Sequence, residues 1–412
     1  MELLYILLVI LVVTRACGEF AVRINQPALV GELIGGVILG IVAHQFDASL
    51  PVLAELDSNE VFLAITDLGV FFLMLLAGLE MHPRDLAKAS GGAFVVAVAG
   101  FLVPLAVGCA LGWFYLPASE WKPAQVLFIG TALAITAIPL AVKVLLDMGQ
   151  LETRAGRVIV SAAIFDDVFG LLLLAVLTAL LETGELPGAS GFLFLAGRIV
   201  LFFGITTVLG LRVLPFVARR LKKFWVEELE FSALLAVALV FCVLAEWLGL
   251  HFILGAFVAG LFFTGRALGS SLYDDVSRKI SAITTGFLAP VFFASIGLHL
   301  EVSALVEIPV FVVVLCVLAL LSKFVGAGLA AKFVGLTRSD AAGVGVAMSA
   351  RGAVELIIAD IALQAGLFDK PAPRPPIVAH LFSAVVIMAI ATSVLMPLGL
   401  RLFLRPSGRR AG

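Results

Sequence analysis

The sequence is poor in charge. Asp, Glu, Lys and Arg make up only 14% of its 412 residues, whereas an ordinary soluble domain has about a quarter. Hydrophobic residues make up 62%, and apolar runs of the length that crosses a bilayer, about 20 residues, recur along the whole chain. The composition therefore excludes an ordinary soluble fold and predicts an all-α membrane protein with many spans.

Patterns of metal-binding and processing residues are also missing. The four cysteines, Cys17, Cys109, Cys242 and Cys316, form no CxxC pair or other metal-site spacing, so we expect small core residues. A signal peptide has basic residues before its apolar stretch. Here the apolar stretch is residues 1–13, and the first basic residue, Arg15, comes after it. We therefore interpret this segment as the first membrane helix.

Thirteen segments are candidate spans. Six of them lie before the seventh and six lie after it. An odd number of spans between two halves inverts the second half, as in many secondary transporters. The candidates are 3–17, 27–44, 61–80, 91–114, 124–147, 157–181, 192–217, 229–248, 252–266, 284–300, 308–334, 341–365 and 377–404.

The loops between the spans alternate in charge, except for the loop at 369–374, which has two basic residues and one acidic residue. The loop with Arg219 and Lys223 is strongly basic, whereas the loop with Glu301 and Glu307 is acidic. The positive-inside rule places the basic set in the cytoplasm. We therefore expect a multi-pass protein of the cell membrane, a bacterial inner membrane, with its N-terminus outside and its C-terminus in the cytoplasm.

Two adjacent carboxylates, Asp166 and Asp167, interrupt the apolar segment 157–181. A carboxylate at the centre of a bilayer costs at least about 2.5 kcal/mol, and two neighbours also repel each other. The plain structural alternative is a polar contact between helices, but one Asn would serve there at lower cost. The pair instead indicates a site that holds a cation in one state and a proton in another.

Lys323 lies near the middle of the segment 308–334 and is the natural counter-ion of the pair. A buried lysine titrates readily, so it can itself release a proton when a cation arrives. In the alternative interpretation the side chain simply reaches the cytoplasmic interface.

Two spans carry signals of an interruption in mid-membrane. In 341–365, Ser349 and Gly352 flank Arg351, and Glu355 follows Arg351 by four residues, on the same helix face. In 124–147, two further residues mark a break: Thr136 offers a hydroxyl oxygen, and Pro139 removes a backbone donor. Interrupted helices at matching places in two halves are typical of ion sites in transporters.

Short motifs along nearly the whole chain form a recognisable set, which includes Thr136-Ala137, the pair Asp166-Asp167, Lys323 and Arg351-Gly352. The others are PALVGEL at 27–33, GVILG at 36–40, LAGLE at 76–80 and GAFVAG at 255–260. Together they resemble the cation:proton antiporter-2 family of monovalent cation/proton antiporters.

The resemblance implies the sodium/proton antiporter fold, with about thirteen helices, inverted repeats and two crossing broken helices. A core of spans 4–6 (91–182) and 11–13 with a short basic tail (304–412) would carry transport. A panel of spans 1–3 (1–90) and 8–10 (224–303) would form a homodimer, and span 7 (183–223) would link them.

The resemblance also implies residue roles. Asp167 would be the main cation and proton carrier, and Asp166 would pair with Lys323, while Thr136 completes the site. The residues that support the broken helices would be Pro139, Ser349, Arg351, Gly352 and Glu355. Several relatives have Arg-Gly-Glu, but Ala353 takes the place of that Glu here, so the choice between Na⁺ and K⁺ stays open.

The predicted function is secondary-active exchange of Na⁺ or K⁺ for protons by alternating access. We expect no enzymatic activity, no cofactor and no nucleic-acid partner; the partners are the ions and the lipid bilayer. A cation channel or a non-transporting membrane sensor is the alternative. An intramembrane aspartyl protease needs its aspartates on different helices, and usually a Gly-x-Gly-Asp segment, neither of which the adjacent pair provides.

Overall fold

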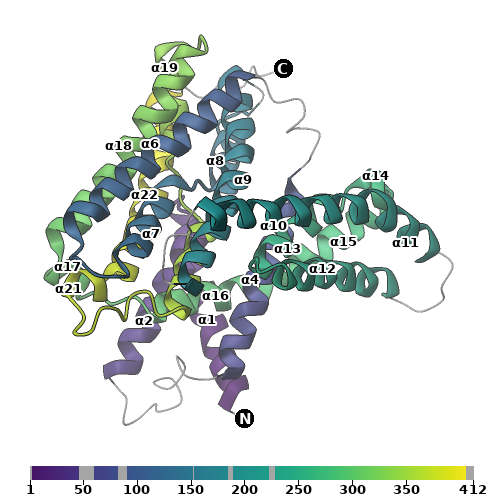
Figure 1. The fold of residues 1–412 in the computed structure, drawn as a ribbon, viewed down its shortest axis with the longest axis horizontal. Coiled ribbons are helices and arrows are strands. Elements are labelled where there is room, and N and C mark those ends of the chain that lie inside the picture. Colours follow the sequence, from purple (N-terminus) through teal and green to yellow (C-terminus); the bar gives the residue numbers. More distant parts are fainter. Residues whose placement is uncertain are drawn as a thin grey trace. The chain divides into compact units, whose positions relative to one another are not determined.

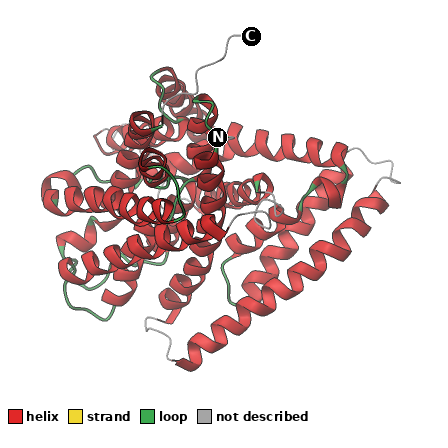
Figure 2. Ribbon diagram, turned by 90° about the horizontal axis from the view of Figure 1, so that it is seen from above, coloured by secondary structure: helices red, strands yellow, loops and turns green. Residues whose placement is uncertain are grey.

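The computed structural model describes residues 2–45, 60–81, 91–151, 153–183, 189–221 and 228–404. Within these ranges every regular element is a helix and there is no strand (Figures 1 and 2). Nine of the described helices are both long and apolar enough to cross a membrane. The expected all-α polytopic class is confirmed, whereas the number of thirteen spans stays a prediction. Lys223 and the basic tail at 405–412 lie outside the described residues.

The chain forms two compact units, and helices α1 (Glu2–Arg23) and α2 (Ala28–Gln45) contribute to both. The first unit comprises Met1–Arg15, Gly35–Arg84 and Pro187–Leu298. Its other helices are α4 (Glu60–Glu80), α10 (Ala189–Val208), α11 (Leu214–Leu221), α12 (Leu229–Trp247), α13 (Phe252–Phe262), α14 (Gly265–Leu268), α15 (Ser270–Ile283) and α16 (Ala289–Leu298).

Glycines bring α4 and α13 of the first unit into backbone contact. A methyl group on Gly78 would meet the carbonyl oxygen of Phe257, and one on Gly260 would meet that of Leu75. Such close approach of backbones is a main source of helix association in lipid. A π-helical turn, Thr284–Leu288, joins α15 to α16, so the expected span at 284–300 in fact begins at Ser270.

The second unit comprises Ala16–Ile34, Asp85–Leu186 and His299–Gly412. Its helices are α6 (Gly91–Tyr115), α7 (Lys122–Ala134), α8 (Ile138–Asp147), α9 (Arg154–Thr183), α17 (Ala304–Glu307), α18 (Pro309–Phe333), α19 (Arg338–Ala347), α20 (Ala353–Gln364), α21 (Pro376–Ala379) and α22 (Leu381–Phe403). Small residues again set the spacing, because a methyl group on Gly326 of α18 would lie 2.7 Å from the Ala99 carbonyl of α6. The division into a transport core and a dimerisation panel stays a prediction.

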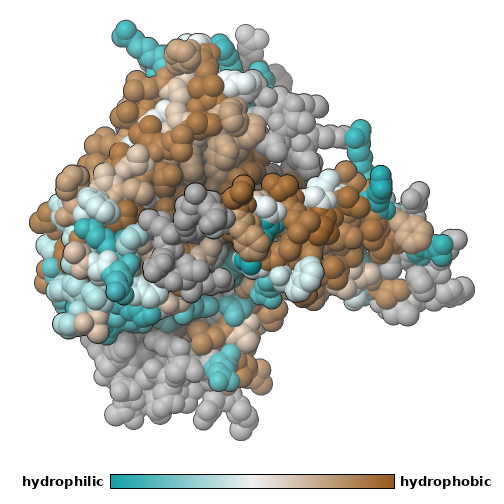
Figure 3. All heavy atoms as spheres, in the orientation of Figure 1, coloured by the Kyte–Doolittle hydropathy of each residue, from teal (hydrophilic) through white to brown (hydrophobic). Residues whose placement is uncertain are grey.

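Helix α18 shows how the second unit separates lipid from core. A stripe of large apolar side chains along one face is exposed, as the brown surface over this helix in Figure 3 shows. The stripe consists of Val310, Val313, Val317, Leu321, Val325, Leu329 and Phe333. Its spacing of three or four residues is that of one helix face. Lys323 lies on the opposite face and is fully buried, so the lysine points into the core.

Both spans with expected interruptions are broken. The span at 124–147 consists of α7 and α8, which are separated by residues 135–137. The span at 341–365 consists of α19 and α20, which are separated by residues 348–352. We call these the first break (135–137) and the second break (348–352).

Candidate cation and proton site

Helix α9 places the aspartate pair at the centre of the second unit. The Asp166 side chain is fully buried, and Asp167 is only 7% exposed. Successive residues on a helix point about 100° apart, so the two carboxylates face different neighbours. The pair therefore divides into one carboxylate with a cationic partner and one without.

Asp166 is the carboxylate with the partner. Lys323 Nζ of α18 lies 3.2 and 3.1 Å from the two Asp166 carboxylate oxygens and donates to Thr136 Oγ1 at 2.7 Å. Both side chains of the ion pair are fully buried. The structure thus brings together the lysine, the first aspartate and the threonine of the first break, all of which the sequence singled out.

Asp167 is the carboxylate without the partner. Among the described residues, its Oδ1 atom is buried and has no hydrogen-bond partner. A buried carboxylate that lacks a counter-charge is unstable when ionised. The oxygen can be satisfied by a monovalent cation or by a proton, and both cannot occupy one oxygen lone pair at once.

The two breaks cross and satisfy each other's backbone. The N–H of Ala137 in the first break donates to the carbonyl of Ala350 in the second, at 2.8 Å. The hydroxyl of Thr136 donates to the carbonyl of Met348, at 2.9 Å. Polar backbone groups in a bilayer need protein partners, and each break provides them for the other.

Arg351 fastens the second break to the end of α7. Its Nη2 donates to the carbonyl of Leu133 at 2.6 Å, and Nη1 donates to the carbonyl of Ile135. Its Nε lies 3.5 Å from Glu355 Oε2, too far for a hydrogen bond, so the two form an ion pair only. Ser393 of α22 donates to the Arg351 carbonyl at 2.9 Å.

The other residues expected to support the breaks have local roles. Pro139 is the second residue of α8, in the first turn, where a missing N–H costs nothing. The hydroxyl of Ser349 donates to the carbonyl of Val346, near the end of α19. A methyl group on Gly352 would lie 2.6 Å from the Ala137 Cβ atom. Ser393 did not stand out in the sequence, because single serines are frequent in membrane helices.

The charge of this cluster is unbalanced by one. The buried carboxylates are Asp166, Asp167 and Glu355, and the buried bases are Lys323 and Arg351. With every group ionised, three negative charges face two positive ones. One monovalent cation or one proton at Asp167 therefore makes the cluster neutral, which favours a site that is occupied by either of them.

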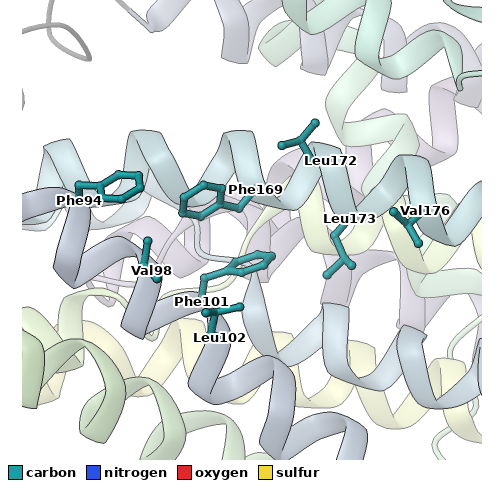
Figure 4. Close-up of a pocket in the computed structure, with 8 residues that line it drawn as sticks. All are labelled: Phe94, Val98, Phe101, Leu102, Phe169, Leu172, Leu173 and Val176. Carbon is teal, nitrogen blue, oxygen red and sulfur yellow. The ribbon is translucent and has the colours of Figure 1, made fainter. Parts of the chain in front are cut away.

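A cavity of about 410 Å³ lies in the second unit, between α6 and α9. Figure 4 shows that only apolar side chains line it, among them Phe94, Phe101 and Phe169. The rings of Phe101 and Phe169 are 5.4 Å apart. Without a polar group this cavity is unsuited to an ion, so the polar cluster around Asp167 stays the candidate site.

Crossed broken helices beside a buried acid pair are features expected of a membrane carrier of ions. The chain belongs to the sodium/hydrogen exchanger family, a class of transporters rather than enzymes, because the model described as "Sodium/hydrogen exchanger, transmembrane" matches residues 6–405. The expected membership among monovalent cation/proton antiporters is thus confirmed.

Characterised relatives match over nearly their full length. The chain is 30% identical to the Na(+)/H(+)-K(+) antiporter GerN of Bacillus cereus, over 96% of this chain and 95% of that one. It is 29% identical to the Na(+)/H(+) antiporter of Enterococcus hirae, over 98% of each. The solved sodium proton antiporter MjNhaP1 of Methanocaldococcus jannaschii has a TM-score of 0.67 at 16% identity and 97% coverage of each chain. That structure confirms the sodium/proton antiporter fold.

Proposed function

We propose that this protein exchanges a monovalent cation, Na⁺ or K⁺, for protons across a membrane by alternating access. The observation that carries the proposal is the buried Oδ1 atom of Asp167, which has no hydrogen-bond partner among the described residues. The membership of this chain in a family of cation/proton antiporters supports the proposal. Because proton and cation compete for one carboxylate, releasing one allows the other to bind.

The neighbours of Asp167 complete the proposed site. The cation ligands are the carboxylates of Asp167 and Asp166 and the hydroxyl oxygen of Thr136, which keeps a lone pair beyond the bond from Lys323. Lys323 holds Asp166 ionised and in place. Hard monovalent cations prefer such oxygen ligands.

The remaining residues hold the frame of the site. Arg351 joins the two breaks through the α7 carbonyls, and Glu355 balances its charge. Pro139, Ser349 and Gly352 shape the chain around the breaks. The proposed setting is a homodimer in a bacterial inner membrane, with the N-terminus outside and the C-terminus in the cytoplasm, as the alternation of loop charge indicates.

The test is flux in proteoliposomes with an imposed pH gradient. One salt at a time, of Na⁺, K⁺, Li⁺ or Rb⁺, is the only cation, and internal pH is followed with a dye. Cation-dependent dissipation of the gradient is the expected result, and the most effective cation identifies the substrate. Cation flux without proton movement would instead identify a channel, and no flux of either ion would refute the proposal.

A further inference from the structure

One end of the second unit has a histidine between two carboxylates. His380 immediately precedes α22, and its side chain is only 7% exposed. Its Nε2 is hydrogen-bonded to Glu307 Oε2 at 3.0 Å. Its Nδ1 lies 3.0 Å from Glu301 Oε2, at ion-pair distance but outside hydrogen-bond alignment. The two glutamate side chains are 63% and 52% exposed.

The charge of the ring decides how strongly this contact holds. A neutral imidazole carries one N–H and one lone pair. Each neutral form can donate to only one of the two carboxylates and leaves its unprotonated nitrogen 3.0 Å from an oxygen of the other. The imidazolium form attracts both carboxylates. Histidine can gain and lose a proton, so the contact has a stronger form with a protonated ring and a weaker form with a neutral one.

Other charged groups at this end of the unit are engaged elsewhere. Asp369 and Arg374, between α20 and α21, pair with each other at 3.0 Å. Lys370 lies over a tryptophan ring, 4.0 Å from its centre. Asp360 of α20 accepts a hydrogen bond from Gln364, and the ring of His299 approaches that of Phe382. Among the described residues, Glu301 and Glu307 are the charged groups at ion-pair distance from His380.

The contact fastens a connecting segment to a helix that reaches the proposed ion site. The backbone N–H of Glu301 donates to the hydroxyl of Ser383 in the first turn of α22, at 2.9 Å. The segment 301–307 is thus held to α22 at His380 and at Ser383. The same helix continues to Ser393, which donates to the carbonyl of Arg351 in the second break.

We propose that His380, Glu301 and Glu307 form a pH-sensitive latch, which fastens the segment 301–307 to the start of α22 when the imidazole is protonated. The acidic loop places the latch on the outer side of the membrane. The latch then couples external pH to the rigidity of α22 and of the second break. This consequence for exchange rests on the proposed function, whereas the latch itself does not.

The latch is tested by hydrogen exchange of the whole protein in lipid nanodiscs, with peptides that cover 301–308. After correction for intrinsic rates, wild-type protection is expected to be about three- to tenfold greater at about pH 6 than at about pH 8. His380→Gln should remove this difference. Glu307→Gln should reduce it and serves as the second variant if His380→Gln does not fold.

The matched control is His299→Gln, which removes another histidine at the same end of the unit. It should keep the pH difference in the 301–308 peptides. The latch is wrong if His380→Gln keeps the difference or if His299→Gln abolishes it. Exchange flux in the same preparations separates the two proposals: a protein without flux refutes the antiport, and a peptide without pH-dependent protection refutes the latch alone.

Discussion

The two breaks differ in what they provide. The first break and the end of α7 provide two acceptors, the carbonyls of Leu133 and Ile135. The first break also provides two donors, the hydroxyl of Thr136 and the N–H of Ala137. The second break provides the guanidinium of Arg351 as a double donor, and its own carbonyls accept from Thr136 and Ala137. One break thus contributes backbone groups and a hydroxyl, whereas the other also contributes a buried cation.

This difference shows where an ion can bind. Interrupted helices are often regarded as sources of free carbonyls for ions. Here the carbonyls of Ile135, Met348 and Ala350 already accept hydrogen bonds from the opposite break. Beside them, two carboxylates have buried oxygens without a hydrogen-bond partner among the described residues: Glu355, which lies at ion-pair distance from Arg351, and Asp167, which has no ion pair among the described residues. The breaks therefore position the site, and a side chain provides its charge.

The largest effect is expected for Asp167→Asn, which keeps the side-chain shape and removes the charge. We expect no exchange with any cation at any pH, because an amide neither ionises nor takes up the proton. Proteoliposome flux measures this. Asp275→Asn, an acid of the first unit that pairs with Lys279, is the control and should exchange normally. Substantial flux through the Asp167→Asn protein would move the carrier role elsewhere.

Removing one partner of the Lys323–Asp166 pair should lower stability next most strongly. Lys323→Ala and Asp166→Asn should each cost about 3–5 kcal/mol, because a buried charge loses its partner. Thermal unfolding in detergent of both single variants and of the double variant measures the coupling. The double variant should lose less than the two single losses together. Lys332→Ala, an exposed lysine on the same helix, controls for the loss of a lysine; strictly additive losses would argue against the pair.

Crowding the crossing should separate the breaks. Gly352 has extended backbone that alanine can adopt, but its methyl group would lie 2.6 Å from the Ala137 Cβ atom. Gly352→Ala should therefore cost about 1–3 kcal/mol of stability and slow exchange. Ala137→Gly in the same protein should restore both, since it removes the facing methyl group. Gly286→Ala, where nothing lies within 4 Å, is the control. Failure of the second substitution to rescue would show that the breaks are not in contact there.

The smallest effect is expected for Thr136→Val, which removes the hydroxyl between Met348 and Lys323. The loss should be about 1–2 kcal/mol, since a buried carbonyl and a lysine N–H lose their partner. Thr136→Ser should retain most of the stability. Thr131→Val controls for the loss of a threonine within α7, whose hydroxyl bonds to its own helix. Thermal unfolding and flux compare the four proteins, and equal losses at 131 and 136 would remove any special role of Thr136.

Much of this candidate site could be predicted because charged residues are rare in the sequence. In a chain with 14% charged residues, an ionisable group inside an apolar segment is conspicuous, and Asp166, Lys323 and Arg351 all lie in the same buried cluster. The helical class could be predicted because the apolar segments are long enough to cross a membrane as helices. The interruptions at 135–137 and 348–352 followed from residues that disfavour a continuous helix in lipid.

What the sequence did not reveal depends on long-range geometry. The partners of Arg351 are backbone carbonyls, which every residue has, so no residue type identifies Leu133 or Ile135. Ser393 resembles any serine in an apolar span. The helix at 270–298 was underestimated, because its polar first half is joined to the apolar half by a π-helical turn. The roles of individual site residues and the dimer remain predictions.

The reciprocal crossing also has a consequence for biosynthesis. Arg351 follows Ile135 by 216 residues in the chain, and at about 5–20 residues per second the ribosome needs roughly 10–40 s to make that stretch. During this interval the carbonyls at the end of α7 have no guanidinium donor. Because hydrocarbon does not tolerate bare backbone groups, the nascent α7–α8 segment has to wait in a continuous helix or beside water. The first half of this carrier therefore matures only when the last quarter of the chain has entered the membrane.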